Sequence, residues 1–354
     1  MRAFGGTREK PMDEAADPFE YFFRLPWTDG LPVVTPTEAR IAWMLGGTKR
    51  SPGGSLGHVP PAGHEATVEQ AAIHAVMAGA RPEYLPAILG ALEAVLAERF
   101  NLNGLQATMG PGGPMVMFNG PYARKIGVHG GSGCMGPGFR ANAAIGRALR
   151  LMMLNLGGAI PGVSDMSCFG HPDKFSFCLS ENEELSPWPP LSADLGFGPG
   201  EDVVTVFAAE GPHQAFDDSS SEPDGLLATI ASVMSTMGSS NAYMRQNMVI
   251  AMSPDHAEVM RRAGYSRRDV KRRLFELARL PVGQMRKGGR FRQSGRVDWP
   301  AWVDRDDDAC LVPMIHDPDD ILLLVAGGRP GPHSMIVPGW NKSSRFVSIR
   351  YRTG

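Results

Sequence analysis

The chain has 354 residues, of which 43% are hydrophobic, and a formal net charge of -2 at pH 7. A chain of this length can bury one large or two modest cores. Its charge argues against a protein whose whole surface binds nucleic acid or a membrane. The longest apolar stretch, at 143–163, contains Arg147 and Arg150, so we expect no membrane-spanning helix.

The start of the chain and its cysteines indicate the cytoplasm. The first 18 residues are polar and acidic where a signal peptide would need an apolar run. The four cysteines form no C-x-x-C pair and no zinc-like spacing. We therefore expect a cytoplasmic protein with reduced thiols. We also expect a homo-oligomer, although the apolar helices predicted within 68–97 and 224–237 can pack either internally or across a subunit interface.

The predicted elements alternate between helices and apolar strands. Residues 1–24 are expected to form a poorly ordered arm, followed by a short strand at 31–34. Thr35-Pro36-Thr37-Glu38 has the pattern of a capping box with an early proline, and it predicts a helix that ends at Gly46-Gly47. Further helices are predicted at 68–78, 82–96, 139–155, 224–237, 254–263 and 267–279.

Three apolar runs, at 115–118, 203–207 and 321–325, are each followed by a Gly-Pro turn. Such runs suit strands that are covered on both faces. They predict an α/β fold with mostly parallel or mixed sheets covered by helices, arranged as two lobes (25–200 and 201–354) that share a central site. Ordinary turn chemistry is the alternative explanation. If ligands bind beyond the carboxyl ends of the strands, one rim would collect Asn119, Glu210, His213, Arg329 and His333.

Eleven glycines lie within the thirty-five residues from Gly104 to Gly138, directly before the predicted helix at 139–155. This density needs a geometric reason, such as positive φ or a close approach of the backbone to a ligand. A glycine-rich turn that opens a helix presents N–H groups and the positive end of the helix dipole to a phosphate or carboxylate. A compact loop that binds nothing is the alternative. The candidate substrate-binding residues are Asn119, Gly133, Cys134, Gly138, Arg140, Asn142 and His333.

Cys134 has two interpretations of its own. The helix dipole could lower the pKa of its thiol and make it a nucleophile. A small apolar residue in a tight turn is the interpretation that we favour. The segment contains neither a Gly-Lys-Ser/Thr sequence nor a dinucleotide fingerprint, so it does not identify the ligand.

Residues 165–191 concentrate groups suited to proton transfer. His171 lies among several carboxylates and two cysteines, and histidine side chains generally titrate near neutral pH. If residues 175–179 form a strand, alternation places Glu181 on the same buried face as Phe177 and Leu179, where burial raises a carboxyl pKa. A structural, hydrogen-bonded histidine is the alternative for His171. The candidate catalytic residues are His171 and Glu181, with Glu210 and His213 as second candidates.

Two further interpretations stay open. Histidines are spread widely and no H-E-x-x-H occurs, yet a divalent metal held by His, Asp or Glu at the strand ends would make the protein a metal-dependent hydrolase. No individual metal ligand and no organic cofactor is predicted. Residues 261–296 contain thirteen Lys or Arg against Asp269 and Glu276 only. This basic face is typical of a nucleic-acid or partner-binding module, although a solvated face paired with the acidic stretch at 304–308 is the explanation that we favour.

Several segments carry a resemblance to a known family. FNGPYARKIG, GPGFRANAAIGRALRLMMLNLGGAIPG, FCLSENEELSPWPPL and ILLLVAGG together resemble a bacterial family of largely uncharacterised proteins. The C-terminal part of that family is similar to domains named for a UGSC motif that contains cysteine or selenocysteine. This chain has no such quartet in its C-terminal part, and the nearest match, Gly131-Ser132-Gly133-Cys134, lies elsewhere. The resemblance therefore implies no particular activity.

The residues favour an enzyme that acts on a small anionic or polar metabolite, with no membrane partner. We expect lyase, hydratase or hydrolase chemistry, in which a carbon–heteroatom bond is cleaved or formed by side-chain acid–base catalysis. Histidine and carboxylate side chains are sufficient for these reactions, because none of them needs an organic cofactor.

Overall fold

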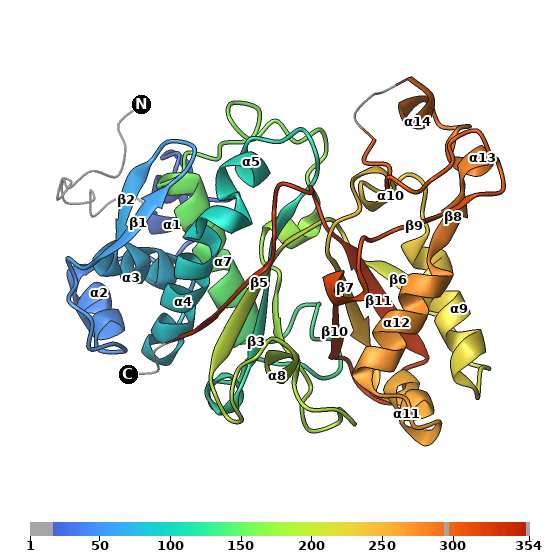
Figure 1. Ribbon diagram of the computed structural model, residues 1–354. Helices are drawn as coiled ribbons and strands as arrows, with labels where there is room; N and C mark the ends of the chain where they lie inside the picture. The colour runs from blue at the N-terminus through green and yellow to red at the C-terminus, as the bar shows by residue number, and fades with distance from the viewer. Residues whose placement is uncertain (1–16, 294–296, 352–354) are drawn as a thin grey trace.

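Two four-stranded mixed β-sheets lie at the centre of the protein (Figure 1). The computed structural model describes residues 17–293 and 297–351. In spatial order, the first sheet consists of β12 (Val347–Arg350), β5 (Val203–Ala209), β3 (Gly113–Asn119) and β4 (Cys178–Ser180). The second sheet consists of β10 (Ile321–Val325), β7 (Met248–Met252), β11 (His333–Pro338) and β6 (His213–Phe216). Two short ribbons add β1 (Ser55–Val59), β2 (His64–Thr67), β8 (Arg279–Pro281) and β9 (Leu311–Pro313).

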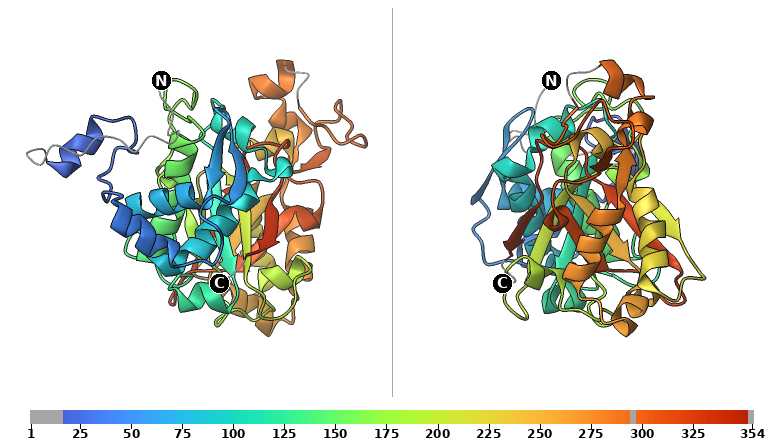
Figure 2. Two further views of the ribbon diagram at one scale, coloured as in Figure 1. Left: turned by 90° about the vertical axis from the view of Figure 1, so that its left-hand side faces the viewer. Right: turned by 45° about the vertical axis from the view of Figure 1, so that its right-hand side comes forward.

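Helices cover the outer face of each sheet, as the turned views of Figure 2 also show. The first sheet is covered by α4 (Leu85–Leu96) and α7 (Arg140–Asn155), with α3 (Val68–Met77) packed against these two helices. The second sheet is covered by α9 (Pro223–Met234) and α12 (Arg267–Leu277), with α11 (Pro254–Arg262) packed against α9. The remaining helices are α1 (Pro18–Phe23), α2 (Glu38–Leu45), α5 (Leu102–Gln106), α6 (Pro121–Lys125), α8 (Leu191–Asp194), α10 (Asn241–Met244), α13 (Val282–Met285) and α14 (Gly289–Gln293). Single 3-10 turns occur at Pro82–Tyr84, Glu98–Phe100, Pro172–Lys174 and Pro318–Asp320.

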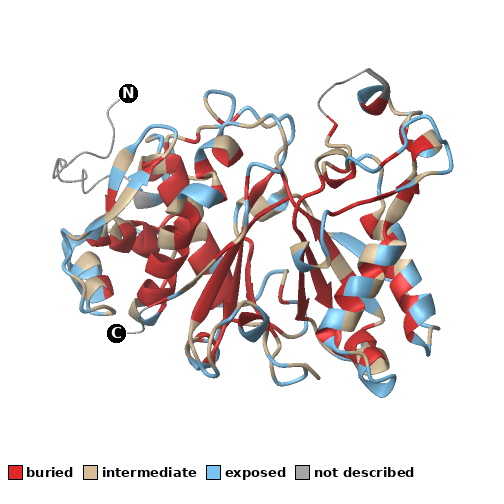
Figure 3. Cartoon of the chain, viewed as in Figure 1, coloured by how far each residue is buried: buried red, intermediate tan, exposed pale blue. Residues whose placement is uncertain are grey.

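The two sheets pack face to face, which makes a four-layer α/β/β/α arrangement. Side chains alternate between the two faces of each strand, so Met115 and Met117 of β3 enter the core between the sheets. Their neighbours Val116 and Phe118 pack with α4 and α7 instead. Buried residues, red in Figure 3, therefore run along whole strands. The predicted α/β fold with mixed sheets covered by helices is confirmed, and the near-continuous apolar runs are explained by burial on both faces.

Local capping signals set the helix starts. The Thr37 side chain accepts a hydrogen bond from the Arg40 N–H at the start of α2, and Thr67 does the same for Gln70 at the start of α3. Ser266 and Asp269 form a reciprocal capping box on α12. The predicted helices are confirmed to within a few residues. The capping box predicted at 35–38 placed Pro36 in the first helical position, whereas α2 begins at Glu38 with Thr37 as its N-cap.

One local expectation was wrong. Residues 31–34 form no strand, because no neighbouring strand pairs with them. Residues 1–16 of the predicted arm lie outside the described residues, but its last part contains α1. The predicted boundary at residue 200 does not separate the sheets. β5 pairs with β3 over seven residues and β12 pairs with β5, so segments from both predicted parts build the first sheet.

His74 on α3 makes the fold sensitive to acid. Complete burial lowers the pKa of His74 from 6.5 to about 4, although its Nδ1 contacts the Gln70 carbonyl oxygen. Between these two pH values the unfolded chain binds a proton that the folded protein excludes, so stability falls as the pH falls. We expect acidification from pH 7 to pH 4 to remove about 3 kcal/mol through His74. Urea unfolding across this range should show a clearly flatter pH dependence for His74→Leu, and an unchanged slope would contradict the assignment.

Candidate functional site

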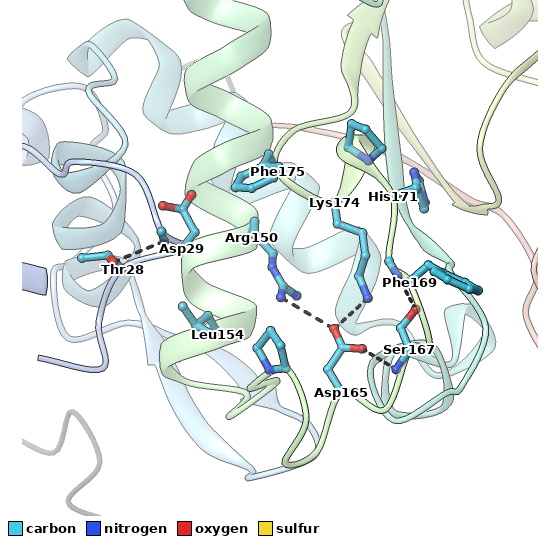
Figure 4. Close-up of a pocket in the computed structure, with 14 residues that line it drawn as sticks. Thr28, Asp29, Arg150, Leu154, Asp165, Ser167, Phe169, His171, Lys174 and Phe175 are labelled. Atoms are coloured by element: carbon cyan, nitrogen blue, oxygen red, sulfur yellow. Dashed lines mark hydrogen bonds and ion pairs between the residues drawn. The ribbon is translucent and has the colours of Figure 1, made fainter.

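A pocket of about 670 Å³ opens between α7, the chain before α2 and the loop that follows α7 (Figure 4). This volume is in the range of small-molecule sites. The loop supplies most of the wall, and α7 supplies Arg150 and Leu154. The lining residues are Thr28, Asp29, Gly30, Arg150, Leu154, Pro161, Asp165, Ser167, Phe169, Gly170, His171, Pro172, Lys174 and Phe175. We call this cavity the His171 pocket.

Asp165 holds the pocket loop in place. Its side chain is only 4% exposed, and its Oδ2 lies 2.7 Å from Lys174 Nζ and 3.7 Å from the Arg150 guanidinium. Its Oδ1 accepts a hydrogen bond of 3.2 Å from the Ser167 N–H. One carboxylate is therefore shared by two cations, which leaves the group with a net charge of about +1 by this count.

Arg147 and Arg150 lie one turn apart on α7 but have very different surroundings. Arg147 donates two hydrogen bonds of 2.8 Å to Asp29 and two more to the carbonyl oxygens of Leu31 and Pro32. Arg150, whose side chain is 12% exposed, donates a single long bond of 3.5 Å to the Ala159 carbonyl oxygen. Burial lowers the pKa of Arg150, and nearby Asp165 and Asp29 oppose that shift. A guanidinium has five N–H donors. With one long hydrogen bond among the described residues, Arg150 leaves most of these donors without a hydrogen-bond acceptor.

His171 faces the same pocket. Its side chain is 11% exposed, and Nδ1 lies 3.4 Å from the Asp173 carboxylate. Neither ring nitrogen makes a hydrogen bond with the described residues. The ring lies near Gly113, the first residue of β3, where an added Cβ would be 3.8 Å from Nε2. A buried imidazole with free nitrogens beside a carboxylate has the equipment for proton transfer to a bound ligand.

Glu181 lies at the opposite end of the first sheet. Its Oε2 accepts hydrogen bonds from Asn119 (2.7 Å) and the Leu191 N–H (2.6 Å). Its Oε1 accepts bonds from Arg267 (3.0 Å) and the Val325 N–H (3.4 Å). Burial raises the pKa of the Glu181 carboxyl, and Arg267 and the other donors oppose that shift.

The structure does not bring His171 and Glu181 together. His171 lies against the first residue of β3, whereas Glu181 contacts the last residue of that strand. Seven extended residues place these ends about 20 Å apart. The two first candidates for proton transfer therefore belong to different regions, and Glu181 does not line the His171 pocket.

The second candidates lie nearer to His171 along the sheet. Gly113 pairs with Ala209, so Glu210 follows the strand end beside which His171 lies. Burial raises the pKa of Glu210, although the neighbouring Ser240 and Ser239 hydroxyls and His213 oppose that shift. His213 begins β6 and is exposed. Neither residue lines the pocket.

The predicted single rim of strand ends was wrong. β3 and β5 are antiparallel, so Asn119 and Glu210 follow opposite ends of the same sheet. Asn119 is engaged by Glu181 and Glu183. His333 is exposed at the start of β11, where its ring lies 5.2 Å from that of Phe216. Arg329 is exposed and lies 3.4 Å from the Asp255 carboxylate.

The glycine-rich loop packs against the second half of the chain. The Gly327 N–H donates to the Gly130 carbonyl oxygen, and a Cβ on Gly130 would collide with the backbone of Ser180. The Asn142 side chain accepts a hydrogen bond from the His129 N–H and donates hydrogen bonds to the carbonyl oxygens of His129 and Cys134. These bonds hold the loop against α7. Gly133 and Gly138 adopt positive φ, of 74° and 118°. Close backbone approach and turn geometry thus account for much of the glycine density.

Two loop residues predicted to bind substrate also have partners in the chain. Arg140 is exposed, and its Nε donates to the Gly79 carbonyl oxygen (3.0 Å). Cys134 is buried, and this burial raises the pKa of its thiol, whereas activation by the helix dipole would require a lowered pKa. The tight-turn interpretation of Cys134 is therefore the one that its surroundings favour.

The basic helices α11 and α12 are largely neutralised within the chain. Arg267, expected on a cationic face, is instead buried against Glu181. Lys271 pairs with Asp319, Arg272 with Asp269, and Arg273 with Asp224 and Glu276. Charged side chains that pair in this way leave less free positive charge for a nucleic acid.

Reasoning from the sequence missed Arg150, Lys174 and Asp165 as site residues. The available signal was the pair of arginines inside the longest apolar stretch, where a charge needs a partner or a ligand. Within 17–293 and 297–351, no group of three or more His, Cys, Asp or Glu is arranged to hold a metal ion. In the same residues, no helix combines the length and apolar character needed to cross a bilayer. Comparison with models of protein families, with curated proteins and with solved structures finds no match.

Proposed function

We propose that the protein is a cytoplasmic enzyme that uses the His171 pocket for acid–base chemistry on a small anionic metabolite. The reaction class is addition, elimination or hydrolysis at a carbon–heteroatom bond. In each case a proton leaves one atom and another atom gains one, so a single imidazole can accept the first proton and return it. The four free cysteines agree with a reducing compartment.

The observation that carries the proposal is the His171 ring. The ring lines a cavity large enough for a metabolite, and both of its nitrogens are buried without a hydrogen bond among the described residues. Buried polar groups of this kind usually have a partner, and a turn of the ring toward the cavity would let a bound substrate supply it. Asp173, 3.4 Å from Nδ1, would orient the ring so that Nε2 exchanges the proton.

Arg150 and Lys174 supply the binding charge in this scheme. Arg150 would take the anionic group of the substrate through its unused N–H donors, and Lys174 would add a second positive charge. Asp165 keeps both cations in place before the substrate arrives. Such preorganisation lowers the cost of binding and of stabilising charge during the reaction.

The test uses an activity screen and one substitution. The purified chain is incubated with a mixture of carboxylate and phosphate metabolites, and mass spectrometry identifies any compound that it converts. With that compound, His171→Asn should lower kcat at least about a hundredfold, because the proton carrier is lost. His316→Asn is the matched control, since His316 also pairs with an aspartate, Asp298 at 3.1 Å, but is exposed and lies outside the pocket.

The outcomes separate clearly. A large loss in His171→Asn with normal turnover in His316→Asn supports the proposal. Turnover that His171→Asn leaves within about threefold of the wild type would remove His171 from the chemistry. Activity that disappears with a chelator and returns with a divalent metal would instead favour the metal-dependent hydrolase.

A further inference from the structure

We propose that the substrate of the His171 pocket is an amphipathic monocarboxylate, with its carboxylate at Arg150 and an aromatic or branched apolar body between Phe169 and Phe175. This inference rests on the proposed function, because it names the substrate class of the same pocket. It is carried by the charge of the pocket, by the apolar part of its lining and by the exposed phenylalanines at its rim.

The charge count favours a monoanion. Arg150 and Lys174 share the single carboxylate of Asp165, which leaves one positive charge among these three groups. The Asp173 carboxylate lies against His171 and is not part of the pocket lining. The Asp29 carboxylate is paired with Arg147, and its remaining effect on Arg150 is smaller than that of Asp165. One carboxylate balances this surplus, and its two oxygens match the planar fork of a guanidinium. A phosphate dianion would leave negative charge unbalanced inside a partly buried cavity.

The lining is apolar away from these charges. Leu154 belongs to α7, and Pro161, Pro172 and Phe175 belong to the loop that follows it. In Figure 4, Phe169 and Phe175 lie on opposite sides of Lys174 and His171. A ligand whose head reaches Arg150 would therefore meet hydrocarbon along the rest of its length, which is the usual composition of metabolite sites.

The rim exposes large apolar side chains to solvent. Phe169 is 98% exposed, and Phe175 is 45% exposed. Met109 is 73% exposed and lies beside the loop, because its carbonyl oxygen accepts a hydrogen bond from the Cys168 N–H. Large exposed apolar side chains around a pocket are typical of a surface that is covered when the protein works. Because Phe169 and Phe175 line the pocket itself, the apolar part of the substrate is the group that would cover them.

The experiment compares four probes by calorimetric titration of the full chain. 3-Phenylpropionate has both the head and the body, acetate has only the head, 3-phenylpropanol has only the body, and phenyl phosphate exchanges the head for a dianion. We expect 3-phenylpropionate to bind at least about tenfold more tightly than each of the others, because burying a phenyl ring and pairing a carboxylate each exceed this factor.

A matched pair of substitutions locates the body. Phe169→Ala should weaken 3-phenylpropionate binding by about five- to tenfold and leave acetate binding unchanged. Phe216→Ala is the control, because Phe216 is 53% exposed but lies on β6 and does not line the pocket. It should change neither affinity.

Each alternative outcome overturns the inference in a recognisable way. Equal affinities for acetate and 3-phenylpropionate would mean that the body contributes nothing. Tighter binding of phenyl phosphate would replace the monocarboxylate with a phosphate ester. Reduced self-association of Phe169→Ala with unchanged ligand affinity would identify the rim as an interface between copies of the chain. None of these binding results depends on proton transfer. Normal turnover in His171→Asn would contradict the proposed function, whereas 3-phenylpropionate would still bind more tightly than the other three probes.

Discussion

Replacing Glu181 with alanine should lower the free energy of unfolding by about 3–5 kcal/mol, the usual cost of removing one partner from a buried ion pair. The Glu181 and Arg267 side chains are only 1% and 4% exposed. The substitution leaves the buried Arg267 guanidinium with the Pro189 carbonyl oxygen and, at 4.0 Å, the Asp194 carboxylate. It also removes the acceptor from Asn119 and from the Leu191 N–H. Chemical denaturation monitored by fluorescence measures the loss directly.

Two further variants show whether charge or packing is responsible. Glu184→Ala is the matched control, because Glu184 lies three residues further along and is exposed, and it should change stability by less than about 0.5 kcal/mol. Combining Glu181→Met with Arg267→Met should recover most of the lost stability, since no unpaired charge remains. A cost of less than about 1 kcal/mol for Glu181→Ala would show that the pair contributes little to the fold.

This prediction bears on how Glu181 is assigned. Four donors already occupy the oxygens of its carboxylate, and it connects β3, β10 and α12 across the two sheets. Any loss of turnover in Glu181→Ala must therefore be compared with the fraction of folded protein. His171 differs, because its ring nitrogens make no hydrogen bonds with the described residues. Its replacement should therefore leave the free energy of unfolding nearly unchanged.

The features that could be predicted from the sequence are those set by neighbouring residues. The caps at Thr67 and Ser266 lie within four residues of the groups that they bind, so they identify helix starts directly. At α2 the observed cap, Thr37, lies two residues after the start of the predicted capping box. The apolar runs of β3, β5 and β10 likewise indicated strands buried on both faces. Nothing local sets the direction in which two strands pair, and the antiparallel pairing of β3 with β5 separated the residues expected to share one rim.

In the candidate site, too, contacts between sequence neighbours could be predicted, whereas contacts that depend on the tertiary fold could not. His171 could be found from its sequence neighbourhood, because residues 165–174 form one loop and approach one another locally. Glu181 is only ten residues away but lies beyond β4, and the length of an extended strand carries it out of the site. Arg150 enters the pocket from a helix, and its role depends on the partners that it lacks. A missing partner can be recognised only when the surroundings of the side chain are known.

Arg147 and Arg150 test the difference between an arginine that is paired within the fold and one that has few partners there. Arg147→Met should cost about 3–5 kcal/mol of stability, because Asp29, whose side chain is 3% exposed, would lose its partner. Arg150→Met should stay within about 1 kcal/mol of the wild type, since the guanidinium has weak contacts and Asp165 keeps Lys174. Residues kept for binding commonly contribute little to stability. Urea unfolding of both variants measures the contrast.

Binding should show the complementary result. Arg150→Met is expected to weaken 3-phenylpropionate at least about thirtyfold, because the carboxylate loses its charged, bidentate partner. Stability comparable to the wild type would show that the pocket is intact, so the loss would belong to the missing guanidinium. If Arg150→Met instead destabilises the chain as much as Arg147→Met and leaves ligand affinity unchanged, Arg150 is a structural residue of α7. The anion would then have to be bound by Lys174 alone, which requires Asp165 to release it.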